Sequence, residues 1–471
     1  MKFPLLSLLA VALLCGCIHL NPIYQNTDER PLKSIVVDGD RPPLAFIEFG
    51  EQGSYQDPTQ LQNALDRIKS TPRPLVITYV HGWHNNAASG DVTAFSDWLY
   101  SLSQTQRIRD SGLHLIGVYL GWRGEITDVP VLRQFSFYSR KAAAERLASN
   151  FDCYDAIAAI SQAARESHTA DGQYTVLIGH SFGGLVVERA VAHAINAEIH
   201  GHAPAERSLP ADLILVVNPA SDSVLTRQMI AALASRRTEH SRPFLVSLTS
   251  TADGATGKAF PFSTSLAATT KVFNKVELPG SGARGKRARL QRESERTFYT
   301  KTPGHNRFLI NHETEKLPET MPAPPGGSAL ATNLSHTLKG EEFVTDGGNG
   351  VFDLWRIKRI GNLDVPYWNV SVNPSIIKNH GDIWNTRAQA MMAAIFRMTN
   401  PILNPKVKAR AILKKEPPPP AYVPQAAQPV APPPQRDARQ ERPLLEAAQA
   451  PVAPPAPSPN RRSKASSKTT R

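Results

Sequence analysis

Short apolar runs alternate with segments of helical periodicity along most of the chain. The clearest run is Pro74–Val80, which is apolar at almost every position and is followed by a His-Gly pair. Continuous apolarity of this kind is typical of a strand covered on both faces, as in a parallel sheet. The segment 57–69 instead has its apolar residues on one face, which is typical of a surface helix.

This alternation predicts the α/β class, with a mostly parallel sheet, helices on both faces and right-handed crossovers. The first two runs, 34–38 and 44–49, are separated by a turn and predict an antiparallel pair at the sheet edge. The other expected strands are 74–80, 113–120, 174–179, 213–217, 244–248 and 367–372. The other expected helices are 94–109, one or two within 136–166, 184–195, 223–236 and 383–397.

The pattern breaks down in two places. Glycine, proline and charged residues dominate about 254–366, so we expect a long irregular insertion before the last strand, acting as a lid, a substrate-shaping loop or a disordered segment. Proline runs fill 411–471, which ends in a basic cluster and predicts a disordered, extended tail. One large α/β domain is therefore expected over 36–410, after a polar linker at 18–35.

The N-terminal residues 1–17 predict an export signal, because a basic start precedes an apolar run that is short for a membrane span. Leu14–Cys17 resembles the bacterial lipobox, which implies acylation of Cys17 at the new N-terminus. Ile18 is not the aspartate that retains such lipoproteins at the inner membrane, so the resemblance implies lipid anchoring at the outer membrane of a bacterial envelope. An ordinary cleaved signal peptide is the alternative.

The cysteine count limits crosslinks and metal sites. Once Cys15 is removed and Cys17 is lipidated, Cys153 has no cysteine with which to form an intramolecular disulfide. A zinc site built on several thiolates is excluded for the same reason, and no metal is expected.

The net charge of +12 lies largely in Arg284–Arg296 and Arg461–Arg471. No basic helix is interleaved with aromatic residues, so we do not expect specific nucleic-acid binding. The basic tail favours contact with an anionic envelope surface.

The strongest chemical signal is Ser181, in the sequence Gly179-His180-Ser181-Phe182-Gly183. An apolar strand precedes this G-x-S-x-G motif and an apolar helix follows it, which is the context of a nucleophilic serine on a sharp turn. The residues two before and two after the serine crowd together on such a turn, so only very small side chains fit there, and Gly179 and Gly183 occupy the two positions. Gly184 lets the helix lie close to its strand.

A serine needs a base to accept its proton and an acid to orient that base. In proteins with this motif the acid follows the serine along the chain and the histidine comes last. We predict Asp253, after the strand at 244–248, as the acid, and keep Asp222 as the alternative. We predict His380, between the last strand and the last helix, as the base. The other histidine candidates lie in the insertion: His305, His312 and His336.

An acyl-transfer site also needs two donors for the developing oxyanion. The backbone N–H of Phe182, directly after the serine, is one expected donor. The other is the N–H of Trp83, because Gly82 lets the backbone approach closely after the strand at 74–80. Trp122, at the end of a later strand, either lines the substrate pocket or packs against a helix.

Together the His81–Gly82 loop, residues 179–184, Asp253 and His380 resemble the α/β-hydrolase superfamily, especially bacterial serine esterases and lipase-like members. The resemblance covers about residues 36–400. It implies the α/β-hydrolase fold and hydrolysis of an ester or lipid substrate through an acyl-enzyme, without metal or organic cofactor.

Two other functions stay open at this point. The first is a lipoprotein that tethers the cell envelope and uses a hydrolase fold as a binding scaffold, because such a protein would also need the lipid anchor and the basic tail. An acyltransferase uses the same three residues and differs in the exclusion of water.

Overall fold

The protein is described by a computed structural model. It describes residues 33–127, 136–167, 174–199, 209–234, 243–279, 292–335, 338–361 and 363–404. All of these belong to one compact unit, Met1–Leu413. The predicted export signal with Cys17, most of the linker, and the tail at 411–471 lie outside the described residues.

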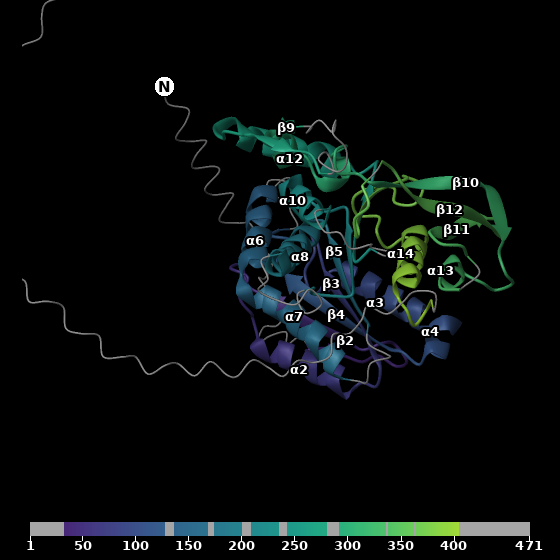
Figure 1. The fold of residues 1–471 in the computed structure, drawn as a ribbon. Coiled ribbons are helices and arrows are strands. Elements are labelled where there is room, and N and C mark those ends of the chain that lie inside the picture. The colour runs from purple at the N-terminus through teal and green to yellow at the C-terminus, as the bar shows by residue number, and fades with distance from the viewer. Residues whose placement is uncertain are drawn as a thin grey trace, which may run out of the picture. The chain divides into compact units, whose positions relative to one another are not determined.

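A large sheet of mostly parallel strands forms the centre of the described chain (Figure 1). Its 11 strands are, from edge to edge, β1 (Ile35–Val36), β2 (Leu44–Phe49), β4 (His114–Trp122), β3 (Pro74–Val80), β5 (Tyr174–His180), β6 (Leu213–Val217), β7 (Leu245–Ser250), β13 (Tyr367–Val372), β10 (His312–Pro322), β12 (Val351–Arg359) and β11 (Glu342–Gly348). All neighbours from β2 to β10 are parallel. The predicted antiparallel pair β1–β2 at the edge is confirmed.

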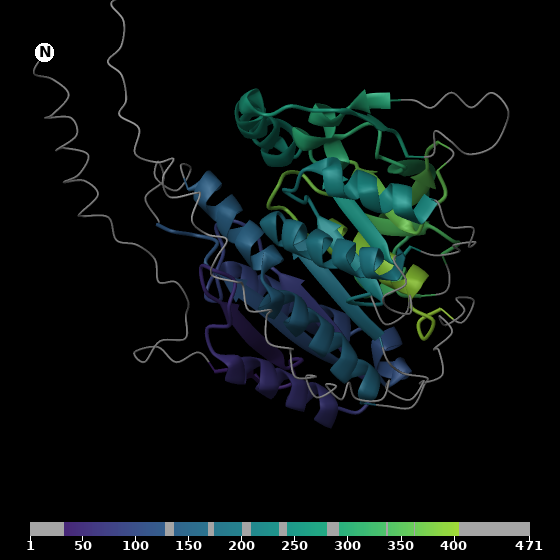
Figure 2. The same ribbon diagram turned by 60° about the vertical axis from the view of Figure 1, so that its left-hand side comes forward.

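Helices cover both faces of this sheet, as the continuous apolar runs predict. The described residues form 11 α-helices: α2 (Pro58–Ser70), α3 (Gly90–Ser103), α4 (Gln106–Ser111), α6 (Phe137–Ser149), α7 (Phe151–Glu166), α8 (Phe182–Ile199), α10 (Ser223–Ala234), α11 (Phe260–Ala267), α12 (Glu295–Tyr299), α13 (Ala329–Asn333) and α14 (Thr386–Thr399). Figure 2 shows a row of them along one face of the sheet.

Strand β3 illustrates the two faces. Val76 and Val80 belong to the core on the side of α2, α6, α7, α8 and α10. Ile77 and Tyr79 belong to the core on the opposite side, with α3, α4 and α14. Because successive side chains of a strand point to opposite faces, a run that is apolar at every position builds both cores at once.

The prediction that 254–366 is irregular is wrong. Its second half extends the sheet, since β10 pairs in parallel with β13 and antiparallel with β12, which in turn pairs with β11. The glycine-rich stretch 346–350 is the tip of the β11–β12 hairpin, where Gly348, Asn349 and Gly350 all have positive φ. Glycine and asparagine are the residues that such tight hairpin turns require. The insertion also contains the small β8 (Lys275–Glu277) and β9 (Arg292–Ser294) pair.

Candidate active site

Ser181 lies on the turn between β5 and α8, with φ at 56°. This left-handed conformation is uncommon for a residue with a side chain and marks a strained turn. The glycines on either side are required by close packing. A Cβ on Gly183 would lie 2.0 Å from the Val80 carbonyl oxygen, and one on Gly179 would lie 2.7 Å from the carbonyl oxygen of Gly183.

A continuous hydrogen-bond chain links Ser181, His380 and Asp253. Ser181 Oγ lies 2.7 Å from His380 Nε2, and His380 Nδ1 lies 2.8 Å from Asp253 Oδ2. Since a carboxylate only accepts, Nδ1 carries the proton and Nε2 is free to accept the serine proton. The three residues that the sequence analysis selected therefore meet, from positions that are up to 199 residues apart.

Asp253 is held as an oriented carboxylate at the start of the turn after β7. Its side chain has no exposed surface, and Oδ1 accepts the N–H of Ala255 at 2.9 Å and of Thr256 at 3.1 Å. Burial raises the pKa of Asp253, but the hydrogen bonds from His380 and Thr256 outweigh it and hold that pKa below its usual value. Asp253 is therefore ionised at neutral pH and favours the Nδ1–H form of His380.

The loop that carries His380 is fixed through its backbone. The His380 carbonyl accepts from His180 Nε2 and from Asn218 Nδ2, each at 2.9 Å. Burial, together with the neighbouring His380, lowers the pKa of His180 to about 4, so His180 is neutral and donates only from Nε2. The sequence analysis missed both contacts; the available signal was a polar residue at or just after the end of a buried strand.

The segments that carry the two expected oxyanion donors lie next to the serine. Phe182 is the first residue of α8, so its N–H has no partner within the helix. The loop of Trp83 passes directly over the serine, because a Cβ on Gly82 would lie 2.6 Å from Ser181 Cβ. Glycine at 82 thus allows the approach that the sequence analysis expected.

His81 holds this loop against the end of β4 through contacts with Trp122. Its ring stacks on Trp122 with centroids 5.5 Å apart and planes 3° from parallel. Trp122 N–H donates to His81 Nε2 and the indole N–H donates to the His81 carbonyl, both at 3.0 Å. Burial lowers the pKa of His81 to about 4, so the ring stays neutral. Trp122 therefore supports the loop instead of lining a substrate pocket.

Aromatic side chains form one wall near the serine. The Phe137 ring lies 5.5 Å from that of Trp83 and 5.4 Å from that of Phe182. Tyr138, which follows at the start of α6, is 56% exposed.

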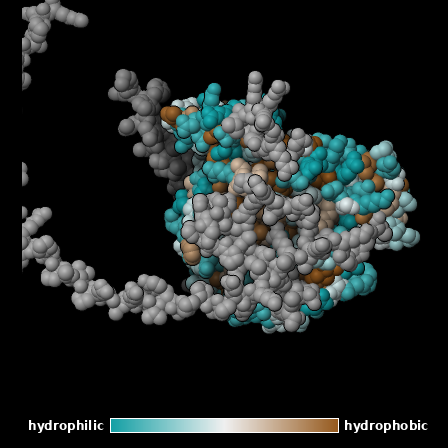
Figure 3. Space-filling model, viewed as in Figure 1, coloured by the Kyte–Doolittle hydropathy of each residue, from teal (hydrophilic) through white to brown (hydrophobic). Residues whose placement is uncertain are grey.

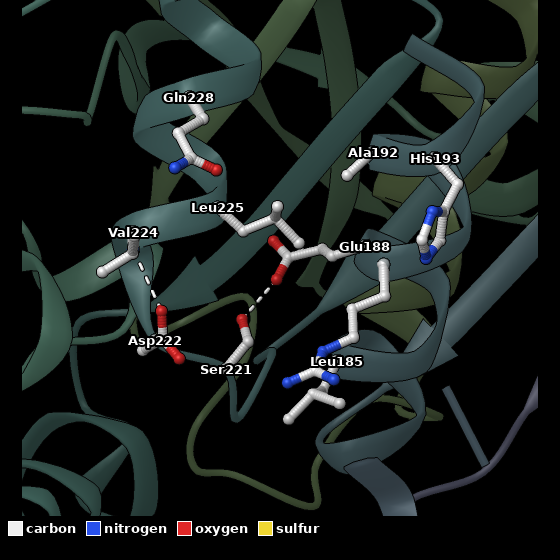
Figure 4. Close-up of a pocket in the computed structure, with 10 residues that line it drawn as sticks. Leu185, Glu188, Ala192, His193, Ser221, Asp222, Val224, Leu225 and Gln228 are labelled. Carbon is white, nitrogen blue, oxygen red and sulfur yellow. Dashed lines mark hydrogen bonds between the residues drawn. The ribbon is translucent and has the colours of Figure 1, made fainter. Parts of the chain in front are cut away.

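The alternative candidates take no part in the chain from Ser181 to Asp253, although His305 lies close to the Asp253 turn. Asp222 accepts the N–H of Val224 at 3.2 Å at the start of α10, beside a separate pocket of about 260 Å³ between α8 and α10 (Figure 4). The His305 ring lies against Gly257, and His312 stacks on Trp368 with centroids 4.5 Å apart. His336 lies outside the described residues.

A second buried acid lies in the α8–α10 pocket. Glu188 is fully buried and accepts a hydrogen bond from the Ser221 hydroxyl (Figure 4). It also accepts one from the Tyr367 hydroxyl. Burial raises the pKa of Glu188 to about 7 against the effect of these hydrogen bonds. The group sits two turns along α8 from Ser181 and contacts neither His380 nor Asp253 through a hydrogen bond among the described residues.

Within the described ranges, no group of three or more His, Cys, Asp or Glu side chains is arranged to hold a metal ion. The same residues contain no helix long and apolar enough to cross a membrane. Cys153 is buried as a free thiol on α7. Comparison of the chain with protein-family models, curated proteins and solved structures gave no match.

Proposed function

We propose that the protein is a serine hydrolase of the α/β-hydrolase superfamily that cleaves carboxylic esters, of the esterase or lipase type. The observation that carries the proposal is the unbroken chain from Ser181 Oγ through His380 to Asp253, with separations of 2.7 and 2.8 Å. A strand–turn–helix context for the serine and the order serine, acid, histidine along the chain support the superfamily.

The geometry suits a two-step reaction. Ser181 Oγ attacks the ester carbonyl carbon while His380 Nε2 takes its proton, and the tetrahedral oxyanion is stabilised by the N–H groups of Phe182 and Trp83. The C–O bond to the leaving alcohol then breaks, and His380 returns the proton to the alcohol. A water molecule, deprotonated by the same nitrogen, then attacks the acyl carbon. The bond from that carbon to Ser181 Oγ breaks, His380 returns the proton to Oγ, and the carboxylic acid is released. Asp253 stabilises the imidazolium in both steps.

The scaffold alternative requires no such chain. Three side chains that meet with correct donor and acceptor roles favour turnover over a purely tethering role. Acyltransfer uses the same residues and is distinguished by whether an added alcohol competes with water for the acyl group.

The cellular setting is also part of the proposal. We expect Cys17 to carry the lipid that anchors the protein at the outer membrane, with the basic tail toward an anionic envelope surface. Metabolic labelling with a fatty acid tests the anchor: label should be lost in Cys17→Ser and kept in Cys15→Ser. Label that persists in Cys17→Ser would contradict the lipobox assignment.

The test of the activity is covalent labelling with a fluorophosphonate probe, followed by turnover of p-nitrophenyl esters of graded chain length. The wild type should label with one probe per chain, Ser181→Ala should not label, and Ser101→Ala, at an exposed serine on α3, should label normally. Unchanged labelling in Ser181→Ala would remove the nucleophile and with it the proposed function.

A further inference from the structure

The segment that follows Asp253 is unusual in charge. Residues 255–276 contain no aspartate or glutamate and three lysines, Lys258, Lys271 and Lys275. All three lysines are exposed. The next acid, Glu277, lies 3.5 Å from Arg292 in an ion pair, so its charge is offset.

The same segment exposes large apolar side chains. Phe262, Leu266 and Val272 are 70%, 56% and 97% exposed. With Tyr138 they account for four of the seven large hydrophobic residues that are exposed among the described residues. Such side chains are normal when scattered singly, but a gathered set marks an interaction surface.

Helical spacing aligns the charged and apolar groups. A short π-helical turn, Ala255–Ala259, runs directly into α11, and Lys258, Phe262 and Leu266 are four residues apart. Residues four apart lie on one face of a helix. The opposite face of α11 is buried through Phe260, Ser263 and Thr264. We call the exposed set Lys258, Phe262, Leu266, Lys271 and Val272 the α11 face.

The α11 face adjoins the candidate active site. The turn that begins it is capped by Asp253, through the N–H groups of Ala255 and Thr256. Tyr138 donates to the Ser263 carbonyl at 3.4 Å, which joins α11 to the aromatic wall beside the serine. In Figure 3, brown hydrophobic atoms lie next to teal hydrophilic ones at the upper left, above α6.

We propose that the α11 face docks the catalytic domain on an anionic lipid bilayer. Exposed apolar side chains flanked by lysines are the pattern of helices that lie in a membrane interface, where the apolar groups enter the acyl boundary and the lysines pair with headgroups. The lysines and the absence of carboxylates over 255–276 select a negatively charged surface. The inference deepens the proposed function by naming a lipid surface as the source of substrate, and docking itself needs no turnover.

Depth-dependent fluorescence quenching tests the docking without relying on the N-terminal anchor. The full chain carries Cys15→Ser and Cys17→Ser, and an environment-sensitive dye is attached at Leu266→Cys. The matched control places the dye at Phe151→Cys, because Phe151 is 76% exposed on α7. Vesicles contain nitroxide-labelled lipid in either phosphatidylglycerol with phosphatidylethanolamine or phosphatidylcholine alone.

On the anionic vesicles we expect quenching of the dye at 266 and none at 151. Replacing the three lysines by glutamine should raise the vesicle concentration for half-maximal quenching roughly a hundredfold, since each cation near an anionic surface changes partitioning about fivefold. A second triple glutamine variant, at exposed lysines elsewhere, should leave it unchanged: Lys33, Lys69 and Lys339.

Two results on vesicles would overturn the proposal: no quenching at 266 while the protein floats with the vesicles, or equal quenching on both lipids. A blue-shifted dye at 266 in lipid-free dimers would also overturn it, because the α11 face would then bind a second copy of the chain. Measuring docking and fluorophosphonate labelling on the same protein, with Ser181 intact, separates the two proposals, and Ser181→Ala should dock normally. Loss of docking with normal fluorophosphonate labelling would refute only the docking proposal. Docking without labelling of Ser181 would refute only the proposed hydrolase function.

Discussion

The role of Asp253 can be isolated by Asp253→Asn, because the two carboxylate oxygens have different partners. Oδ1 accepts the N–H groups of Ala255 and Thr256, and Oδ2 accepts His380 Nδ1–H. An asparagine keeps its oxygen toward the two backbone N–H groups and so presents its NH₂ group to His380. The imidazole must then place its proton on Nε2, where it donates to Ser181 and cannot accept the serine proton.

The variant should therefore stay folded and lose the base. Loss of the correct tautomer in a serine–histidine–acid site costs about 10⁴-fold in rate, which corresponds to about 5 kcal/mol of transition-state stabilisation. The stability change should be only about 1–2 kcal/mol, because the two hydrogen bonds to Oδ2, from His380 and from the Thr256 hydroxyl, are reversed and the backbone contacts are kept.

The measurements are the second-order rate of fluorophosphonate labelling, the turnover of a p-nitrophenyl ester, and urea unfolding. The matched control is Asp222→Asn, at the other candidate acid, which should keep turnover within a few-fold of the wild type. If Asp253→Asn keeps more than a tenth of the wild-type rate while Asp222→Asn loses its activity, the assignment of the acid is refuted.

Three further variants test the packing around the site. Gly183→Ala should destabilise the fold by more than about 3 kcal/mol, since a Cβ 2.0 Å from the Val80 oxygen forces the backbone apart; an unchanged urea midpoint contradicts this. His180→Leu should lower kcat about tenfold with little change in KM, because one donor to the His380 carbonyl is lost, and His180→Gln should restore most of it by replacing the donor; equal kcat in the two variants counts against a positioning role. Glu188 has a pKa of about 7 in the folded state and 4.5 in the unfolded state. Its contribution to the free energy of unfolding is therefore fully present below about pH 4.5 and is lost as pH rises through 7. Glu188→Gln should gain up to about 3 kcal/mol relative to the wild type across that range, and parallel stability curves would show that Glu188 does not titrate there.

The parallel core of the fold could be predicted because its strands are covered on both sides. β3 and β6 have the predicted bounds, Pro74–Val80 and Leu213–Val217, since every position of a doubly covered strand must be apolar. The helix predicted over 94–109 is two helices, α3 and α4. The apolar positions of a surface helix can be recognised in the sequence. The break at Gln104–Thr105 could not, because the apolar spacing continues across it.

The outer strands could not be predicted by the same rule. β10 reads His-Glu-Thr-Glu-Lys-Leu-Pro-Glu-Thr-Met-Pro, and beyond its first residue each position is exposed or half-buried, so its sequence lacks an apolar face. Its partner β13 lies far along the chain, with His312 opposite Val370. Pairing of such a strand is fixed by the register of its neighbours and not by local composition.

Some residues of the candidate site could likewise be predicted from the sequence and others could not. Ser181 has a local motif, and Asp253 and His380 follow from strand order. Their supporting contacts do not, because the hydrogen bond from His180 to the His380 carbonyl spans 200 residues and has no sequence period.

The position of β13 between β7 and β10 has a consequence for the timing of synthesis. A nascent chain that has emerged as far as Ser250 already has β5, α8 and the bend at Ser181, yet the imidazole that would activate the hydroxyl is still to be translated. His380 follows β13, so the hydrogen-bond chain from Ser181 to Asp253 can form only after β13 has paired with β7, more than a hundred residues later.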